Sequence, residues 1–141
     1  MTVPAHDQHT THSYYIRYPA HEPRESDPHY KDFHAYRKRT VATAKCAIGE
    51  HRNDFSECHG PLQLHHGIIE FAVMNAVNLE WLEVDYPGIS NPDEVGAWIE
   101  TAANLVWLCT FHHIGDGGVH VLSSSDYTAE KYVRGLIVDE P

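Results

Sequence analysis

Hydrophobic and polar residues alternate most clearly near the middle of the chain. Leu62 and Leu64 flank Gln63, which predicts a strand within residues 61–69 that carries the adjacent histidines His65 and His66. An apolar run at residues 104–109 is also typical of a strand. Together with the helical patterns around them, these two strands indicate an α+β fold.

Helical spacing and helix-capping residues surround the two strands. Phe71, Met74 and Trp81 recur at a helical period, and Asn91 with Glu94 has the pattern of a capped helix start. The helices expected from such signals span residues 28–43, 70–81, 92–101, 109–114 and 126–135. The long segment between the strands is therefore expected to be a helical insertion.

Large apolar side chains at these positions are expected to form the core. We interpret four aromatic residues as packing residues rather than as a platform for stacking bases: Trp81, Trp98, Trp107 and Phe111. The last helix, capped by Ser125, is expected to close the domain through one apolar face. That face comprises Tyr127, Tyr132, Val133 and Leu136.

The 141 residues fit one domain, and 42% hydrophobic residues provide only a modest core. Residues 1–27 are rich in Pro, His and acidic residues without a clear period, so we expect a flexible arm there and the domain at residues 28–141. No apolar run resembles a signal peptide or approaches the roughly 18 residues of a membrane span. We therefore expect a cytoplasmic protein without membrane contact.

The net charge of −10 argues against broad, non-specific binding of nucleic acid. Basic residues nevertheless gather early, with the densest run at Arg37, Lys38 and Arg39. This run is a candidate for contact with a phosphate backbone. The alternative is that it simply forms a solvated helix face.

Three cysteines and one histidine have spacing that suits a metal. Cys109 and His112 are close enough for one turn to present both ligands, and residues 46–58 are expected to form a loop or knuckle that brings Cys46 and Cys58 together. Tetrahedral zinc takes four such Cys or His ligands, and a small core often needs a metal for stability. Buried free thiols are the alternative, and His51 or His59 could replace one ligand.

The chain has thirteen histidines, and their positions separate them into groups. We interpret His6, His9 and His12 as part of a soluble tail. His65 and His66 point to different sides of a strand, so they are poorly placed to share one structural zinc. They could instead divide the work of a catalytic centre, one holding a metal and the other accepting a proton.

The order strand–His-His followed by Asn-Leu-x-x-Leu-Cys-x-x-His-His resembles the HNH endonuclease family, which has a ββα-metal fold. It is similar in particular to HNH proteins encoded by bacteriophages of actinobacteria, often beside DNA-packaging genes. The likeness covers roughly residues 26–137 and includes Glu-Cys-x-Gly-x-Leu-x-Leu-His-His and Gly-Gly-Val-His-Val-x-Ser-x-Ser-Asp-Tyr. It implies a zinc-stabilised ββα-metal domain that cuts DNA, with a packaging terminase as an expected partner.

The resemblance also implies a role for each matching residue. His66 corresponds to the general base, Asn104 to the asparagine that ties the loop and orients the base, and His65 and His113 to ligands of a catalytic Mg²⁺ or other divalent metal. The positions that match the structural Zn²⁺ ligands are Cys46, Cys58, Cys109 and His112. His120 is a further candidate for the metal or a phosphate, or else a solvent-facing strand residue.

Two departures from the family pattern affect these assignments. Relatives often have two Cys-x-x-Cys knuckles, whereas here one cysteine is replaced by His112 and the other knuckle is spread between Cys46 and Cys58. The segment between His66 and Asn104 is also long. The sequence thus favours a DNA endonuclease, with a non-catalytic zinc module for protein or nucleic acid as the alternative. A hydrolase for another substrate has little support.

Overall fold

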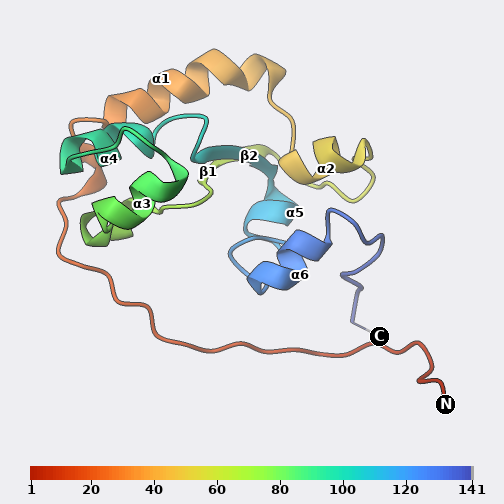
Figure 1. The fold of residues 1–141 in the computed structure, drawn as a ribbon. Coiled ribbons are helices and arrows are strands. Elements are labelled where there is room, and N and C mark those ends of the chain that lie inside the picture. Colours follow the sequence, from red (N-terminus) through yellow and green to blue (C-terminus); the bar gives the residue numbers. More distant parts are fainter. Residues whose placement is uncertain (141) are drawn as a thin grey trace.

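The computed structural model describes residues 1–140 and shows a small α+β fold (Figure 1). The final residue of the expected domain, at 141, lies outside the described residues. In chain order the elements are η1 Arg24–Ser26, α1 Tyr30–Thr40, η2 Val41–Thr43, α2 Ala47–Arg52, β1 Leu62–His66, η3 Phe71–Ala76, α3 Leu79–Asp85, α4 Pro92–Trp98, β2 Leu105–Cys109, α5 Thr110–His113 and α6 Ser124–Ala129. Among residues 1–140, no helix has the length and apolar character needed to cross a membrane.

The sheet consists of β1 and β2, which pair antiparallel and confirm both predicted strands. In this register Leu62 lies opposite Cys109, and His66 lies opposite Leu105. The backbone amide of Gly67 continues the pairing by donating to the carbonyl of Asn104 at 2.6 Å. The short helix α5 follows β2 directly and contacts both strands. One end of this strand pair therefore carries the cysteine Cys109, and the other end carries the histidine His66.

Two separate apolar clusters support the hairpin. The first joins α2 to β2 and consists of Cys46, Ile48, Leu108 and Cys109. The second lies within the insertion between the strands and consists of Phe71, Ile89, Val95 and Ile99. Helix α1 contributes no buried residue, but Trp107 of β2 donates its indole N–H to Thr40 at 2.9 Å. The insertion thus has a small core of its own.

The helix expected at residues 70–81 is wrong, because the segment divides into two. The 3-10 helix η3 ends at Ala76, and the side chain of Asn78 accepts the backbone N–H of Trp81. This cap starts a second helix, α3, in a new direction. Trp81 consequently faces solvent with 76% of its surface exposed, so its assignment to the core was also wrong.

The last helix and the cysteine knuckle also differ from expectation. Ser123, rather than Ser125, caps α6 by accepting the backbone N–H of Asp126, and the helix ends at Ala129. The chain then runs along the cysteine knuckle, and the expected packing residues beyond α6 are exposed: Tyr132, Val133 and Leu136. Between Cys46 and Cys58 the chain forms helix α2, which ends where Asn53 adopts a left-handed conformation.

A histidine joins the starts of α1 and α4. His29 Nδ1 lies 2.7 Å from an Asp32 oxygen, and its Nε2 lies 3.0 Å from an oxygen of Asp93. The hydrogen bond to Asp32 is the main cause of a raised His29 pKa; burial opposes it, and Asp93 adds to it. The imidazolium form therefore links the two helices.

We expect this link to make stability depend on pH. A histidine whose pKa is raised by folding contributes most below its unfolded pKa, near 6.5, and loses that contribution as pH rises through the folded value. His29→Gln should therefore destabilise the protein more at pH 6 than at pH 8, by under about 1 kcal/mol. Urea unfolding of wild type and variant at both pH values measures this, with exposed His34→Gln as the control. An equal loss at both pH values would contradict the assignment.

Candidate metal centres

Three cysteines and one histidine meet where α2, the following loop and α5 converge. The ligand atoms of Cys46, Cys58, Cys109 and His112 all lie within 4.8 Å of one another. His112 Nδ1 faces the three sulfurs at 3.6, 3.7 and 3.2 Å, respectively. Cys109 also caps α5 by accepting the backbone N–H of His112. The cluster has the donor set and compactness to bind a metal ion such as zinc.

The electrostatics of this cluster fit a cation among the sulfurs. Burial opposes ionisation of the Cys46 thiol, but hydrogen bonds from His112 and the backbone outweigh it and lower the pKa to about 6. Burial, together with the sulfurs of Cys46 and Cys109, raises the pKa of Cys58 well above its usual range. Three thiolates at this distance repel one another unless a metal lies between them. Isolated buried thiols would have no reason to converge on one imidazole nitrogen.

The far side of the His112 ring faces a buried carboxylate. His112 Nε2 lies 3.7 Å from Glu130 Oε1, and both side chains are buried. Burial raises the pKa of Glu130 to about 7, although His112 and Arg52 act in the opposite direction. Carboxylates commonly orient metal-binding histidines through a hydrogen bond, but at this distance His112 Nε2 has no hydrogen-bond partner. Nothing in the sequence pattern marked Glu130, because the helix expected over residues 126–135 was assigned only apolar packing residues.

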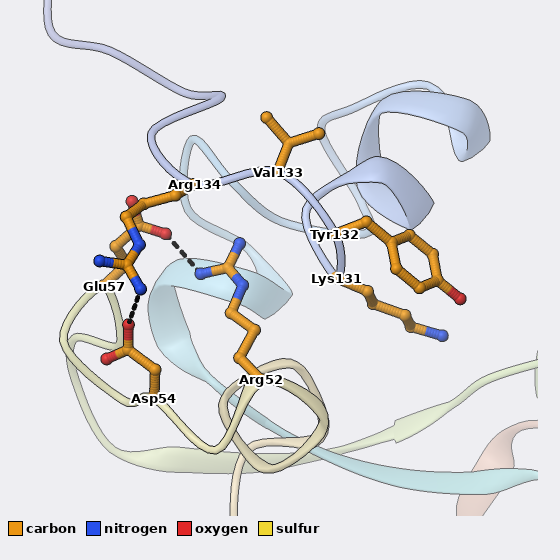
Figure 2. Close-up of a pocket in the computed structure, with 7 residues that line it drawn as sticks. All are labelled: Arg52, Asp54, Glu57, Lys131, Tyr132, Val133 and Arg134. Atoms are coloured by element: carbon orange, nitrogen blue, oxygen red, sulfur yellow. Dashed lines mark hydrogen bonds and ion pairs between the residues drawn. The ribbon is translucent and has the colours of Figure 1, made fainter.

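Ion pairs connect the cysteine knuckle to the C-terminal segment (Figure 2). Arg52 of α2 pairs with Glu57 and donates its Nε–H to the carbonyl of Glu130 at 2.5 Å. Glu57 also accepts the backbone N–H of Gly135 at 3.0 Å, and Arg134 lies 3.7 Å from Asp54. These contacts surround a hollow of about 190 Å³. They hold the loop that delivers Cys58 to the metal cluster.

A second cluster consists of three histidines from β1, α5 and the turn after α5. The ligand atoms of His65, His113 and His120 lie within 4.8 Å of one another. The Nε2 atoms of His113 and His120 are 3.1 Å apart, and His113 Nδ1 is 2.7 Å from Gln63 Oε1. Gln63 thereby fixes the orientation of the His113 ring. His120 belongs to this group of histidines and is also exposed to solvent, and its binding of a metal stays a prediction.

The glycine-rich turn after α5 returns His120 to this cluster. Its backbone N–H donates to the carbonyl of His113 at 3.2 Å. A Cβ atom on Gly118 would lie only 2.4 Å from that carbonyl oxygen, so a larger residue would displace the turn. The glycine-rich turn therefore positions a candidate ligand.

Histidines in this cluster favour the neutral form that metals bind. Burial lowers the pKa of His65 to about 4, and the neighbouring His120, His113 and His66 lower it further. Burial and His120 likewise lower the pKa of His113. A neutral imidazole has a free nitrogen lone pair for a metal. The donor set consequently fits a divalent metal ion.

His66 lies beside this cluster but is not part of it. Its Nε2 is 3.2 and 3.1 Å from the two carboxylate oxygens of Glu100. Its Nδ1 lies 4.0 Å from Glu70, whose other oxygen is 3.7 Å from Nδ1 of His65. The adjacent histidines thus point into different surroundings, as their positions on the strand predicted. Neither Glu70 nor Glu100 was anticipated: Glu70 follows His66 by four residues, whereas Glu100 is 34 residues away along the chain.

Asn104 is fully buried and joins the loop after β1 to the end of α4. Its Oδ1 accepts the backbone N–H groups of Ile68 and Ile69, each at 2.9 Å. Its Nδ2 donates to the carbonyls of Ile69 and Ile99 at 3.0 and 2.9 Å. This arrangement corresponds to the loop-tying role that the resemblance implied. It also holds the backbone next to His66 in place.

We expect Asn104→Ala to be among the more destabilising single substitutions. It removes four hydrogen bonds and leaves one buried and three part-buried backbone groups without these partners, which costs about 3 kcal/mol in comparable cases. Asn75→Ala is the control, because Asn75 is exposed and donates one side-chain hydrogen bond, to Ala20. It should change stability by less than about 0.5 kcal/mol. Urea unfolding of the zinc-loaded proteins compares the two, and equal losses would contradict the role of Asn104.

The remaining candidates belong to neither cluster. Arg37, Lys38 and Arg39 are exposed at the end of α1, where His34, Arg37, Lys38 and Val41 line a shallow hollow. Their contact with DNA stays a prediction. The alternative ligands pack against aromatic rings instead, His51 against Tyr132 and His59 against Phe111.

No protein-family model matches the chain, and no curated protein or solved structure is significantly similar to it. Function therefore has to be argued from the two clusters and their surroundings.

Proposed function

We propose that this chain is a metal-dependent DNA endonuclease of the HNH type. The observation that carries the proposal is the cluster of His65, His113 and His120 with His66 beside it. The elements that hold these residues support it, since two antiparallel strands and a short helix packed on both have the order expected of a ββα-metal site. The separate cysteine cluster would be the structural zinc site.

The proposed reaction is hydrolysis of a phosphodiester bond. A metal held by the three histidines would supply positive charge beside the phosphate and the departing oxygen. His66 would accept a proton from the attacking water, whose oxygen bonds to phosphorus as the P–O3′ bond breaks. The departing oxygen takes a proton from solvent. Asn104 would keep the loop after β1 in place, and Arg37, Lys38 and Arg39 would contact the DNA backbone.

The donor set favours some metals over others. Imidazole nitrogens suit zinc, nickel and similar transition metals, whereas Mg²⁺ prefers oxygen ligands. We therefore expect Ni²⁺, Zn²⁺ or Mn²⁺ to occupy this site more readily than Mg²⁺. The Mg²⁺ that the resemblance implied stays an untested prediction. A partnership with a phage packaging terminase and a location in the host cytoplasm also follow from the resemblance alone.

Cleavage of supercoiled plasmid tests the proposed function. Zinc-loaded protein should nick or linearise the plasmid with Ni²⁺ or Mn²⁺ at lower metal concentrations than with Mg²⁺. His120→Ala should raise the metal concentration needed by about 10- to 100-fold, as losses around metal sites commonly do. Exposed His12→Ala is the matched control and should behave like wild type. Equal metal requirements in wild type and His120→Ala would remove His120 from the site.

A non-catalytic zinc module is the second candidate function. The net charge of −10 favours it, because an acidic protein attracts DNA poorly without a partner. A folded, zinc-loaded protein that cuts no DNA with any of these metals would support this function. The three-histidine cluster with His66 beside it favours the endonuclease, since a purely structural zinc module requires none of these residues.

A further inference from the structure

We propose that Glu100 positions His66 for proton transfer and that Arg24 in turn holds Glu100. The inference rests on the proposed function, because it assigns the support of its general base. The three residues are distant in the chain. Arg24 begins η1, His66 ends β1, and Glu100 is the second residue after α4. No sequence motif connects them.

Glu100 faces His66 from a buried position. Its side chain is only 2% exposed, and both carboxylate oxygens lie within hydrogen-bond distance of His66 Nε2. A carboxylate accepts hydrogen bonds but cannot donate them when ionised. The contact therefore requires the proton of neutral His66 to be on Nε2. Its Nδ1 is then left as the atom that can accept a proton.

The free nitrogen of His66 faces Glu70, a carboxylate that also neighbours His65 of the three-histidine cluster. His66 Nδ1 and His65 Nδ1 face the two oxygens of Glu70, at 4.0 and 3.7 Å. A proton acceptor at His66 Nδ1 would thus lie on the side where His65 begins the metal cluster. Glu100 fixes both the ring's orientation and the tautomer that this arrangement needs.

Arg24 holds the carboxylate from the other side. Its Nη1 lies 3.1 Å from Glu100 Oε1. The guanidinium also lies over the rings of Phe33, Tyr30 and Phe71, at 4.7, 5.3 and 5.2 Å from their centroids. These contacts place an arginine from the expected N-terminal arm against the site. A buried charged carboxylate needs such a partner.

A purely structural ion pair between Arg24 and Glu100 would hold η1 without affecting His66. If Glu100 positions His66, its loss should slow turnover and leave substrate binding unchanged. We expect Glu100→Gln to lower kcat for DNA cleavage by about 10- to 100-fold while KM changes little. Glu100→Asp, which keeps the charge on a shorter side chain, should recover part of the loss. Glu83→Gln is the matched control, since it makes the same change on exposed helix α3.

The tautomer of His66 provides a readout that needs no substituted protein. A ¹H–¹⁵N spectrum of zinc-loaded wild type should show neutral His66 protonated at Nε2, and Arg24→Gln should weaken that signature. His66 protonated at Nδ1 would overturn the proposal even if Glu100→Gln fails to fold.

The kinetic outcomes separate this inference from the function on which it rests. If wild type cuts DNA and His66→Ala does not, while folded Glu100→Gln keeps full kcat, the positioning role fails and the nuclease stands. If wild type cuts no DNA, the proposed function fails and the inference fails with it. Loss of kcat in Glu100→Gln with unchanged KM, together with the Nε2 tautomer in wild type, supports the proposal.

Discussion

Removal of the metal from the cluster of three cysteines and His112 is expected to unfold the protein. Structural zinc contributes about 10–16 kcal/mol in small domains, whereas a whole domain is typically stable by only about 5–15 kcal/mol. The first apolar cluster includes two of the ligands, Cys46 and Cys109, so the metal and this part of the core form one unit. Chelation should therefore abolish the cooperative thermal transition, measured by circular dichroism alongside zinc content.

Two adjacent histidines offer a matched control for this prediction. His112→Ala removes a ligand of the cysteine cluster and should produce a protein that holds no zinc there and does not fold. His113→Ala changes the next residue of the same helix, α5, and should retain the fold and the structural zinc. It should lose only the metal at the three-histidine cluster. A zinc-free protein with an unchanged Tm would show that the cysteine cluster has no structural role.

His66→Ala should abolish DNA cleavage without unfolding the protein. A positioned general base typically contributes about 100- to 10,000-fold to a rate, and the variant should lose a factor in that range. The ring is not a ligand in either metal cluster, so both metals should remain bound. Single-turnover cleavage of supercoiled plasmid measures the rate, and zinc content with circular dichroism verifies the fold.

The control for His66 is His12→Ala, an exposed position in the N-terminal segment. It should cut at the wild-type rate. A His66→Ala protein that also cuts at the wild-type rate would move the proton acceptor to another residue, and Glu70 would be the first to test. Its carboxylate lies between the rings of His65 and His66.

The parts of the fold that were predictable depend on local patterns. Alternating residues around Gln63 specify β1 because a half-buried strand has a period of two. Asn91 caps α4 as expected, because the capping contact involves only nearby residues. The ligand pair Cys109 and His112 was recognisable for the same reason, since one helical turn sets their spacing. Such features can be recognised from a few neighbouring residues, without the rest of the chain.

The unpredicted parts depend on contacts between distant segments. Glu100 and Glu130 are acidic residues, a type that is usually exposed, yet packing buries both. Arg24 lies in a segment without periodicity and gains its partner only through the fold. Trp81 shows the opposite effect, because a helical period suggested burial and the new cap at Asn78 turned the residue to solvent. Periodicity describes an element but not the direction in which it is placed.

The central claim is that the cysteine cluster holds a structural metal and the three-histidine cluster holds a catalytic one. Measuring bound metal and DNA cleavage together tests this claim. Protein prepared with one zinc per chain is titrated with Mn²⁺ or Ni²⁺, and bound metal and plasmid cleavage are followed together. We predict a folded but inactive protein with one metal, and cleavage that rises as a second metal binds and that is lost in His113→Ala. Cleavage by the one-metal protein, or no cleavage when two metals are bound, would contradict this account.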